Sequence, residues 1–86
     1  MAGLDKEDII LKNKIAERVK SLRIKTGLSQ SDFAKLHDID RQIINRWESK
    51  TNKRGITIYT IKRFCNMLDI SLKEFFDFEL ENTHKQ

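Results

Sequence analysis

The stretch "LSQSDFAKLHDIDRQIINRWES", residues 28–49, decides the fold, because its pattern indicates two short helices joined by a tight turn. Ser29 is a typical N-cap residue, and a helix of about two turns after it would bury Phe33 and Ala34. Asp38 stands where the chain must turn, and a short Asx side chain tolerates the left-handed backbone conformation better than most residues do. The stretch therefore predicts a helix, a turn and a second helix.

The second helix of this stretch has one polar and one apolar face. Asp40 can cap it, and at about 100° per residue the apolar Ile43, Ile44 and Trp47 fall on one side. The solvated side of any amphipathic helix would also be polar. However, Arg, Gln and Asn can make paired hydrogen bonds to base edges in the major groove, whereas Glu and Lys are usual on a plain surface. We therefore interpret it as a DNA-reading helix whose polar face consists of Arg41, Gln42, Asn45, Arg46 and Ser49.

A basic loop, "KTNKRG", follows at residues 50–55, and its Lys53 and Arg54 lie where DNA phosphates would run. The whole chain carries 17 Lys and Arg against 13 Asp and Glu, a net charge of +4. Residues 77–86 hold three acids and one lysine, so residues 1–76 carry 16 basic and ten acidic side chains, a net +6. The positive charge lies in the helical part of the chain, which favours a polyanionic partner.

Apolar periodicity predicts three further helices. The first begins between residues 5 and 13 and ends near residue 25, before Gly27. Thr57 would cap a fourth helix and Ser71 a fifth, and no convincing strand is present, so the fold class is all-α. The apolar stripes behind these predictions are Leu11, Ile15, Val19 and Leu22 in the first helix, and Ile58, Ile61, Phe64, Cys65 and Leu68 in the fourth.

We expect a single domain over residues 1–86, with an N-terminal extension at 1–12 and an acidic C-terminal tail at 77–86. No apolar run approaches the roughly 18 residues of a membrane span. The first residues lack the features of a secretory signal, and the single Cys65 cannot form an internal disulfide, so a cytoplasmic location is expected.

An enzyme is not expected. The chain has two histidines, His37 and His84, one cysteine and three glycines in all. It shows no metal-ligand spacing, no phosphate-cradling glycine loop and no nucleophile motif. We expect no catalytic activity, no metal site and no cofactor.

Residues 28–49 resemble, without a gap, the helix-turn-helix of the phage-repressor and Cro-like, or XRE-like, transcription regulators. The usual wording of that family is close to L-S-Q-x-x-L-A-x-x-x-G-V-S-x-x-x-I-x-x-W-E. The resemblance extends from about Ile15 to Phe76, where "MLDISLKEFF" matches the closing A-L-G-V-S-L-x-x-L-L of the family. It implies a compact five-helix repressor-like domain whose recognition helix enters the major groove.

The resemblance also implies residue roles. Arg23 and Glu48 match a pair that forms an internal ion pair between the first helix and the recognition helix. Gln30 matches a contact to the phosphate backbone or to a base. The complete implied DNA-contact set is Gln30, Arg41, Gln42, Asn45, Arg46, Ser49, Lys53 and Arg54.

The chain departs from the family pattern at four positions. Asp38 replaces the usual turn glycine, and His37 stands where a small apolar residue is expected. Ile43 replaces a typical Ser or Thr, so it either presses on a thymine methyl or rests against Trp47. Lys50 replaces a common glycine, which leaves the path of the following loop open.

The function expected from these observations is sequence-specific binding of double-stranded DNA by a transcriptional repressor. We expect a homodimer on a palindromic operator, joined either through Phe78 and Leu80 or through the N-terminal segment Ile9–Leu11. A protein-binding module, such as an antitoxin or an assembly partner, is the alternative from another class. Within the DNA-binding class, a controller protein of a restriction–modification system is a further alternative. An RNA binder is less favoured, because no aromatic platform for stacking bases is evident.

Overall fold

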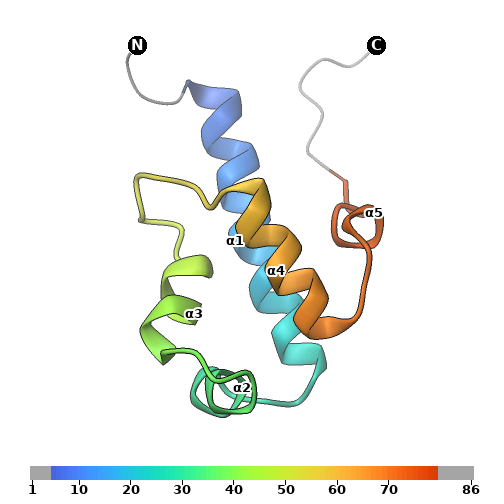
Figure 1. Ribbon diagram of the computed structural model, residues 1–86. Coiled ribbons are helices and arrows are strands. Elements are labelled where there is room, and N and C mark those ends of the chain that lie inside the picture. The colour runs from blue at the N-terminus through green and yellow to red at the C-terminus, as the bar shows by residue number, and fades with distance from the viewer. Residues whose placement is uncertain (1–4, 80–86) are drawn as a thin grey trace.

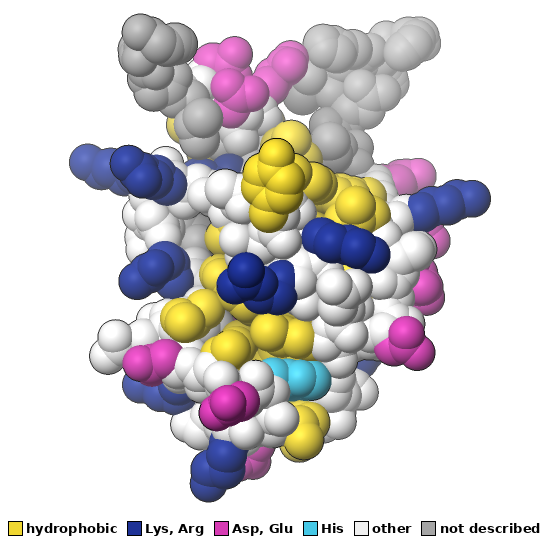
Figure 2. All heavy atoms as spheres, in the orientation of Figure 1, with side chains coloured by type: hydrophobic (Ala, Val, Ile, Leu, Met, Phe, Trp, Pro, Cys, Tyr) yellow, Lys and Arg dark blue, Asp and Glu magenta, His cyan; other side chains and the backbone are white. Residues whose placement is uncertain are grey.

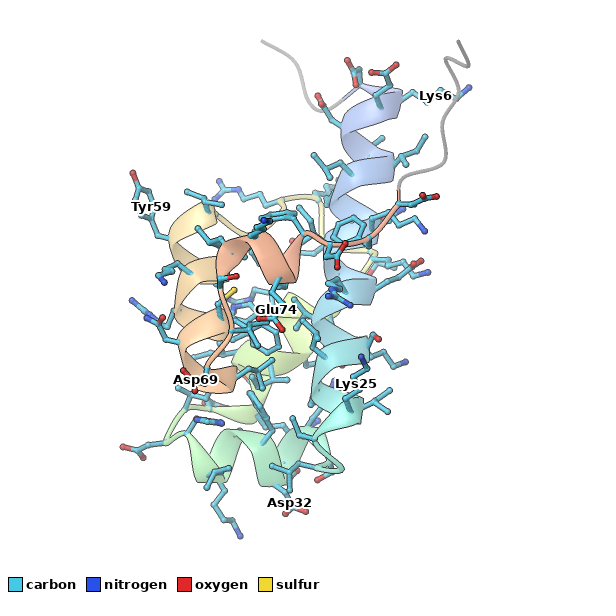
Figure 3. All side chains as sticks on the ribbon, turned by 90° about the vertical axis from the view of Figure 1, so that its right-hand side faces the viewer. Lys6, Lys25, Asp32, Tyr59, Asp69 and Glu74 are labelled. Carbon is cyan, nitrogen blue, oxygen red and sulfur yellow. The ribbon has the colours of Figure 1, made fainter. Side chains whose placement is uncertain are left out.

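A computed structural model describes residues 5–79, and within this range the chain forms five α-helices and no strand. In Figures 1 and 3, α1 and α4 lie on opposite sides of the core, α3 and α5 flank them, and α2 closes the lower end. The all-α prediction is confirmed. The helices are α1 (Lys6–Lys25), α2 (Gln30–Leu36), α3 (Arg41–Trp47), α4 (Ile58–Leu68) and α5 (Leu72–Phe75).

Each helix begins at a capping side chain that accepts a hydrogen bond from a backbone N–H of the first turn. In α1 this cap is Asp5, which forms a reciprocal capping box with Asp8. The helix therefore starts at the early limit of its predicted range, and residues 6–12 of the expected extension are helical. The four caps predicted from the sequence are confirmed, and they are Ser29, Asp40, Thr57 and Ser71.

Phe64 of α4 is at the centre of the core and is fully buried. Its ring centroid lies 5.8 Å from that of Phe33 in α2, 6.0 Å from that of Trp47 in α3 and 6.2 Å from that of Phe75 in α5. Val19 adds α1 to the same cluster. One aromatic side chain thus connects four helices, and such pairs contribute roughly 0.5–1.5 kcal/mol each beyond their buried area.

Two residues predicted on the buried stripes are exposed instead. Leu11 is 39% exposed, because the first turns of α1 project beyond the other helices (Figure 1). Ile58 is 48% exposed, because it is the first residue of α4 and stands at the end of the packed bundle. Helical spacing identified the correct face of each helix but not how far along the helix the neighbours extend.

Within residues 5–79, three residues adopt the left-handed backbone conformation, and each ends a helix or forms a turn. They are Gly27, Asp38 and Asp69, with φ values of 82°, 56° and 58°. The left-handed conformation predicted at Asp38 is confirmed, and this residue allows the tight turn between α2 and α3 without a glycine. Asp69, the C-cap of α4, was not predicted, although an aspartate after an apolar helix end is compatible with this conformation.

Substitutions at two of these positions should have different effects on stability. We expect Gly27→Ala to lower the free energy of unfolding by about 1–2 kcal/mol, because its Cβ would meet no atom within 4 Å and only the backbone is strained. Asp38→Gly should leave that free energy equal or raise it by up to about 1 kcal/mol. Urea titration of both variants measures this. A stabilised Gly27→Ala variant would contradict the assigned conformation.

Candidate nucleic-acid interface

The turn between α2 and α3 is short and tightly bonded. The backbone N–H of Ile39 donates to the carbonyl of Ala34 at 2.9 Å, and the Ile39 side chain packs against the core. His37 ends α2, and its ring centroid lies 4.4 Å from that of Phe33. The imidazole therefore takes the place of a small apolar side chain by lying against a core ring. The two helices are held in direct contact.

The two faces of α3 are separated as the sequence predicted. Ile44 and Trp47 are buried, and Ile43 is half-buried and packs against the core. Of the two roles considered for Ile43, packing against the core is the one that the structure supports. The opposite face is exposed to solvent and presents Arg41, Gln42, Asn45 and Arg46.

A buried ion pair joins α1 to the end of α3. Arg23 Nε donates to Glu48 Oε2 at 2.6 Å, and Arg23 Nη2 donates to Glu48 Oε1 at 3.2 Å. The two side chains are only 10% and 4% exposed. Arg23 Nη1 also donates to the carbonyl of Leu28 at 2.7 Å. The pair that the family resemblance implied is present, with the fork geometry that makes Arg–carboxylate contacts strong.

The ion pair extends to the residues expected to meet DNA. Gln30 Nε2 donates to Glu48 Oε1 at 2.9 Å, and Arg41 Nη1 donates to Gln30 Oε1 at 3.5 Å. A side-chain amide has two N–H donors, so Gln30 retains one for a ligand. The first residues of α2 and α3 are therefore linked to each other and to the buried carboxylate.

Hydrogen bonds to α1 fix the loop after α3, whose path the sequence left open at Lys50. Lys50 Nζ donates to Glu17 Oε2 at 2.8 Å, and Lys12 Nζ donates to the carbonyl of Lys50 at 3.0 Å. The hydrogen bond from Lys50 lowers the pKa of the Glu17 carboxyl, so this carboxyl is ionised at neutral pH. The Ser49 hydroxyl lies 3.0 Å from that of Thr51 and helps to shape the loop.

Lys53 and Arg54 stand exposed on this loop, beyond the end of α3. Figure 2 shows Lys and Arg side chains in dark blue along the left edge of the molecule, where α3 and the loop lie in Figure 1. Acidic side chains lie on the opposite edge near α5, and also at the upper end and at the lower left of the molecule. The polar face of α3 and the basic loop thus lie on the same side of the molecule.

Two surface features were not predicted from the sequence. The bracing of the loop by Lys12 and Glu17 has no local pattern that could have indicated it. Tyr59 is 81% exposed and projects away from the body at the start of α4, beside Ile58 (Figure 3). A tyrosine off the apolar stripe of α4 was a signal for this exposed position.

Other kinds of site find little support in the described chain. Residues 5–79 contain no cluster of three or more His, Cys, Asp or Glu that could hold a metal ion. Cys65 is fully buried, and burial raises the pKa of its thiol, which disfavours the reactive thiolate. In the same range, no helix has the length and apolar character to cross a membrane.

Comparison with protein families gives a match to helix-turn-helix proteins over residues 19–75, from the last third of α1 to the end of α5. No curated protein and no solved structure matches the chain. The matched range contains α2, the turn, α3 and the basic loop, so the resemblance inferred from the sequence is confirmed.

Removing the buried carboxylate of Glu48 should destabilise the fold. We expect Glu48→Ala to lower the free energy of unfolding by about 3 kcal/mol or more, because it leaves the Arg23 guanidinium buried without its partner. Glu17→Ala is the matched control, since it breaks an ion pair between side chains about half exposed, and should cost about 1 kcal/mol or less. Chemical denaturation of both variants measures the two losses. Equal losses of unfolding free energy would contradict the role given to the buried pair.

Proposed function

The chain belongs to the XRE-like helix-turn-helix family of DNA-binding regulators, and from this premise we propose that it is a sequence-specific repressor acting as a homodimer. One observation supports this most strongly. The exposed face of α3 carries Arg, Gln and Asn side chains, and a buried ion pair fixes that helix against the core. A cytoplasmic location fits this role.

Base reading is proposed for the exposed face of α3. Arg41 and Gln42 are the first two residues of the helix, where an inserted helix approaches the base edges. An arginine can bond both acceptors of a guanine, and a glutamine or asparagine can bond an adenine in the same paired way. Asn45 and Arg46 lie one turn later and extend the reading surface along the groove.

Phosphate contacts are proposed on both sides of the recognition helix. Lys53 and Arg54 on the loop would contact one stretch of backbone, and the remaining amide N–H of Gln30 would contact another. Ser49, predicted on the helix, lies just beyond the C-cap of α3, and its hydroxyl is proposed as a further phosphate contact because it can accept or donate. These contacts hold the helix in register but do not by themselves select a sequence.

Repression is proposed because occupying a promoter site requires only the DNA-binding surface. A restriction–modification controller would use the same surface and could also activate. Transcription from a promoter that contains the selected site, with and without the protein, separates the two. Activation would overturn the proposed repressor role but not DNA binding.

The proposed dimer contact is centred on Ile58 and Tyr59. Phe78, one residue of the first candidate surface, is half-buried, with its ring centroid 6.0 Å from that of Phe76, and Leu80 lies outside the described residues. Ile9–Leu11 remains open as the second candidate surface. At the start of α4, Tyr59 exposes most of its aromatic side chain beside Ile58. The start of α4 directly follows the loop that is proposed to contact DNA.

Selection of binding sites from a random duplex pool tests the proposed function. A repressor of this kind should enrich a palindrome whose half-sites have centres about 34–36 Å apart. A pool without enrichment, at salt concentrations low enough for binding, would oppose sequence-specific recognition and favour the protein-binding alternative.

Arg41→Ala should reduce specificity rather than general affinity. We expect a loss of about 1–3 kcal/mol on the selected site and much less on random DNA, since a paired contact to guanine acts only where the base is right. Arg63→Ala is the control, because Arg63 is an exposed arginine on α4, and it should leave the affinity for both duplexes unchanged. Fluorescence anisotropy with both duplexes measures this. Equal losses of affinity for Arg41→Ala on the two duplexes would indicate that Arg41 contacts a phosphate instead.

The dimer contact can be tested by sedimentation at micromolar concentration. We expect the parent to be a dimer and the Ile58→Asp, Tyr59→Asp variant to be a monomer, because two carboxylates from each subunit would be buried in a symmetric contact. Leu36→Asp is the matched control on α2, where the leucine is 67% exposed, and it should remain dimeric. A monomeric parent, or a dimeric Ile58→Asp, Tyr59→Asp variant, would contradict the proposed surface.

A further inference from the structure

A small cleft lies between α1, the end of α3 and the basic loop. Its volume is about 30 Å³, and its lining includes the apolar side chains of Trp47 and Ile56. Three basic side chains from three different segments line it, and no acidic side chain does. They are Lys12 of α1, Arg46 of α3 and Arg54 of the loop.

Two hydrogen bonds hold the Lys12 ammonium group at this cleft, and the lysine stem passes beside Gly55. A Cβ added at Gly55 would lie 3.4 Å from Lys12 Cγ, an ordinary van der Waals distance. Lys12 Nζ donates to the carbonyl of Lys50 at 3.0 Å and to Asn13 Oδ1 at 3.2 Å. An ammonium group has three donors, so one remains for a ligand.

The positive charge of the cleft is not neutralised by the described chain. Within residues 5–79, the side chains of Arg46 and Arg54 form no ion pair, and the nearby carboxylate of Glu17 is paired with Lys50. Three cations gathered around one cavity repel one another unless an anion lies between them. An anion would also accept hydrogen bonds from donors that the protein already holds in position.

We propose that this cleft binds a phosphate of the DNA backbone and that Lys12 of α1 is a DNA contact. The inference rests on the proposed function and extends it. A cavity needs roughly 10–15 Å³ to hold one water, so this cleft admits phosphate oxygens but not a large organic ligand. Arg46 lies on the proposed base-reading face, which places the phosphate at the edge of the groove that α3 occupies.

The first experiment compares Lys12→Met with the parent on the selected duplex and on random DNA. Methionine keeps an apolar stem against Gly55 but removes the charge. The slope of log K against log salt concentration should fall in magnitude by about 0.9, with about an eightfold loss of affinity at 0.1 M salt on both duplexes. Lys25→Met is the matched control, because Lys25 lies 13 residues along the same helix on a different side, and its slope should equal that of the parent.

A second experiment locates the contact on the DNA. Single phosphates of the selected duplex are replaced by neutral methylphosphonates, one position at a time. At one position in each half-site, the replacement should weaken the parent about eightfold and leave the affinity of Lys12→Met unchanged. An equal loss for both proteins at every position would overturn the contact.

The outcomes separate this inference from the proposed function. A parent that binds its palindrome normally, together with an unchanged salt slope for Lys12→Met, would overturn the contact alone. If that variant instead loses thermal stability and affinity without a change in slope, Lys12 only braces the loop. Titration with inorganic phosphate, followed through the amide NMR signals of residues 12, 46 and 54, tests whether the cleft binds a free anion instead. If these signals saturate while Lys12→Met leaves the DNA affinity and the salt slope unchanged, the cleft binds a small anion and the proposal is overturned.

Discussion

The ion pair between Arg23 and Glu48 is the constraint on which the rest of the structure depends. It joins the last turn of α1 to the residue that ends α3, and the same carboxylate accepts the amide of Gln30 at the start of α2. Helices of seven residues are too short to be stable alone in water, so α2 and α3 depend on such tertiary contacts. A buried pair is costly unless its hydrogen bonds are satisfied, and here a fork and two further bonds satisfy them.

The fixed position of α3 has a direct consequence for recognition. Because Ile44 and Trp47 are buried in the core, the helix cannot rotate without exposing them, and its polar face keeps one orientation. Arg41 is further connected to the pair through Gln30. Paired contacts to bases require side chains held at defined angles, so the buried network would contribute to specificity without touching DNA.

Local patterns in the sequence were sufficient for the helices and the turn. The caps Ser29 and Asp40 and the left-handed Asp38 follow from the chemistry of single residues. The ion pair could be anticipated only from the family resemblance, because nothing in the spacing of Arg23 and Glu48 indicates that they meet. The resemblance supplied a contact between distant segments that periodicity cannot provide.

The features that escaped prediction depend on contacts between distant parts of the chain. The path of the basic loop is set by Lys12 and Glu17, which precede it by more than 30 residues and show no motif of their own. The exposure of Leu11 and Ile58 depends on where neighbouring helices end, and helical spacing carries no information about that. The proposed phosphate cleft belongs to the same class, since three separate segments build it.

The central claim is that the outer face of α3, supported by the buried pair, is the surface that meets DNA. Titration of the protein with its selected duplex, followed through its backbone amide NMR signals, tests this most directly. We expect the largest shifts at Gln30, along residues 41–49 and in the loop at 50–56. The outer side of α5 should change little. Large shifts confined to α4 and α5, with the signals of α3 unchanged, would contradict the account.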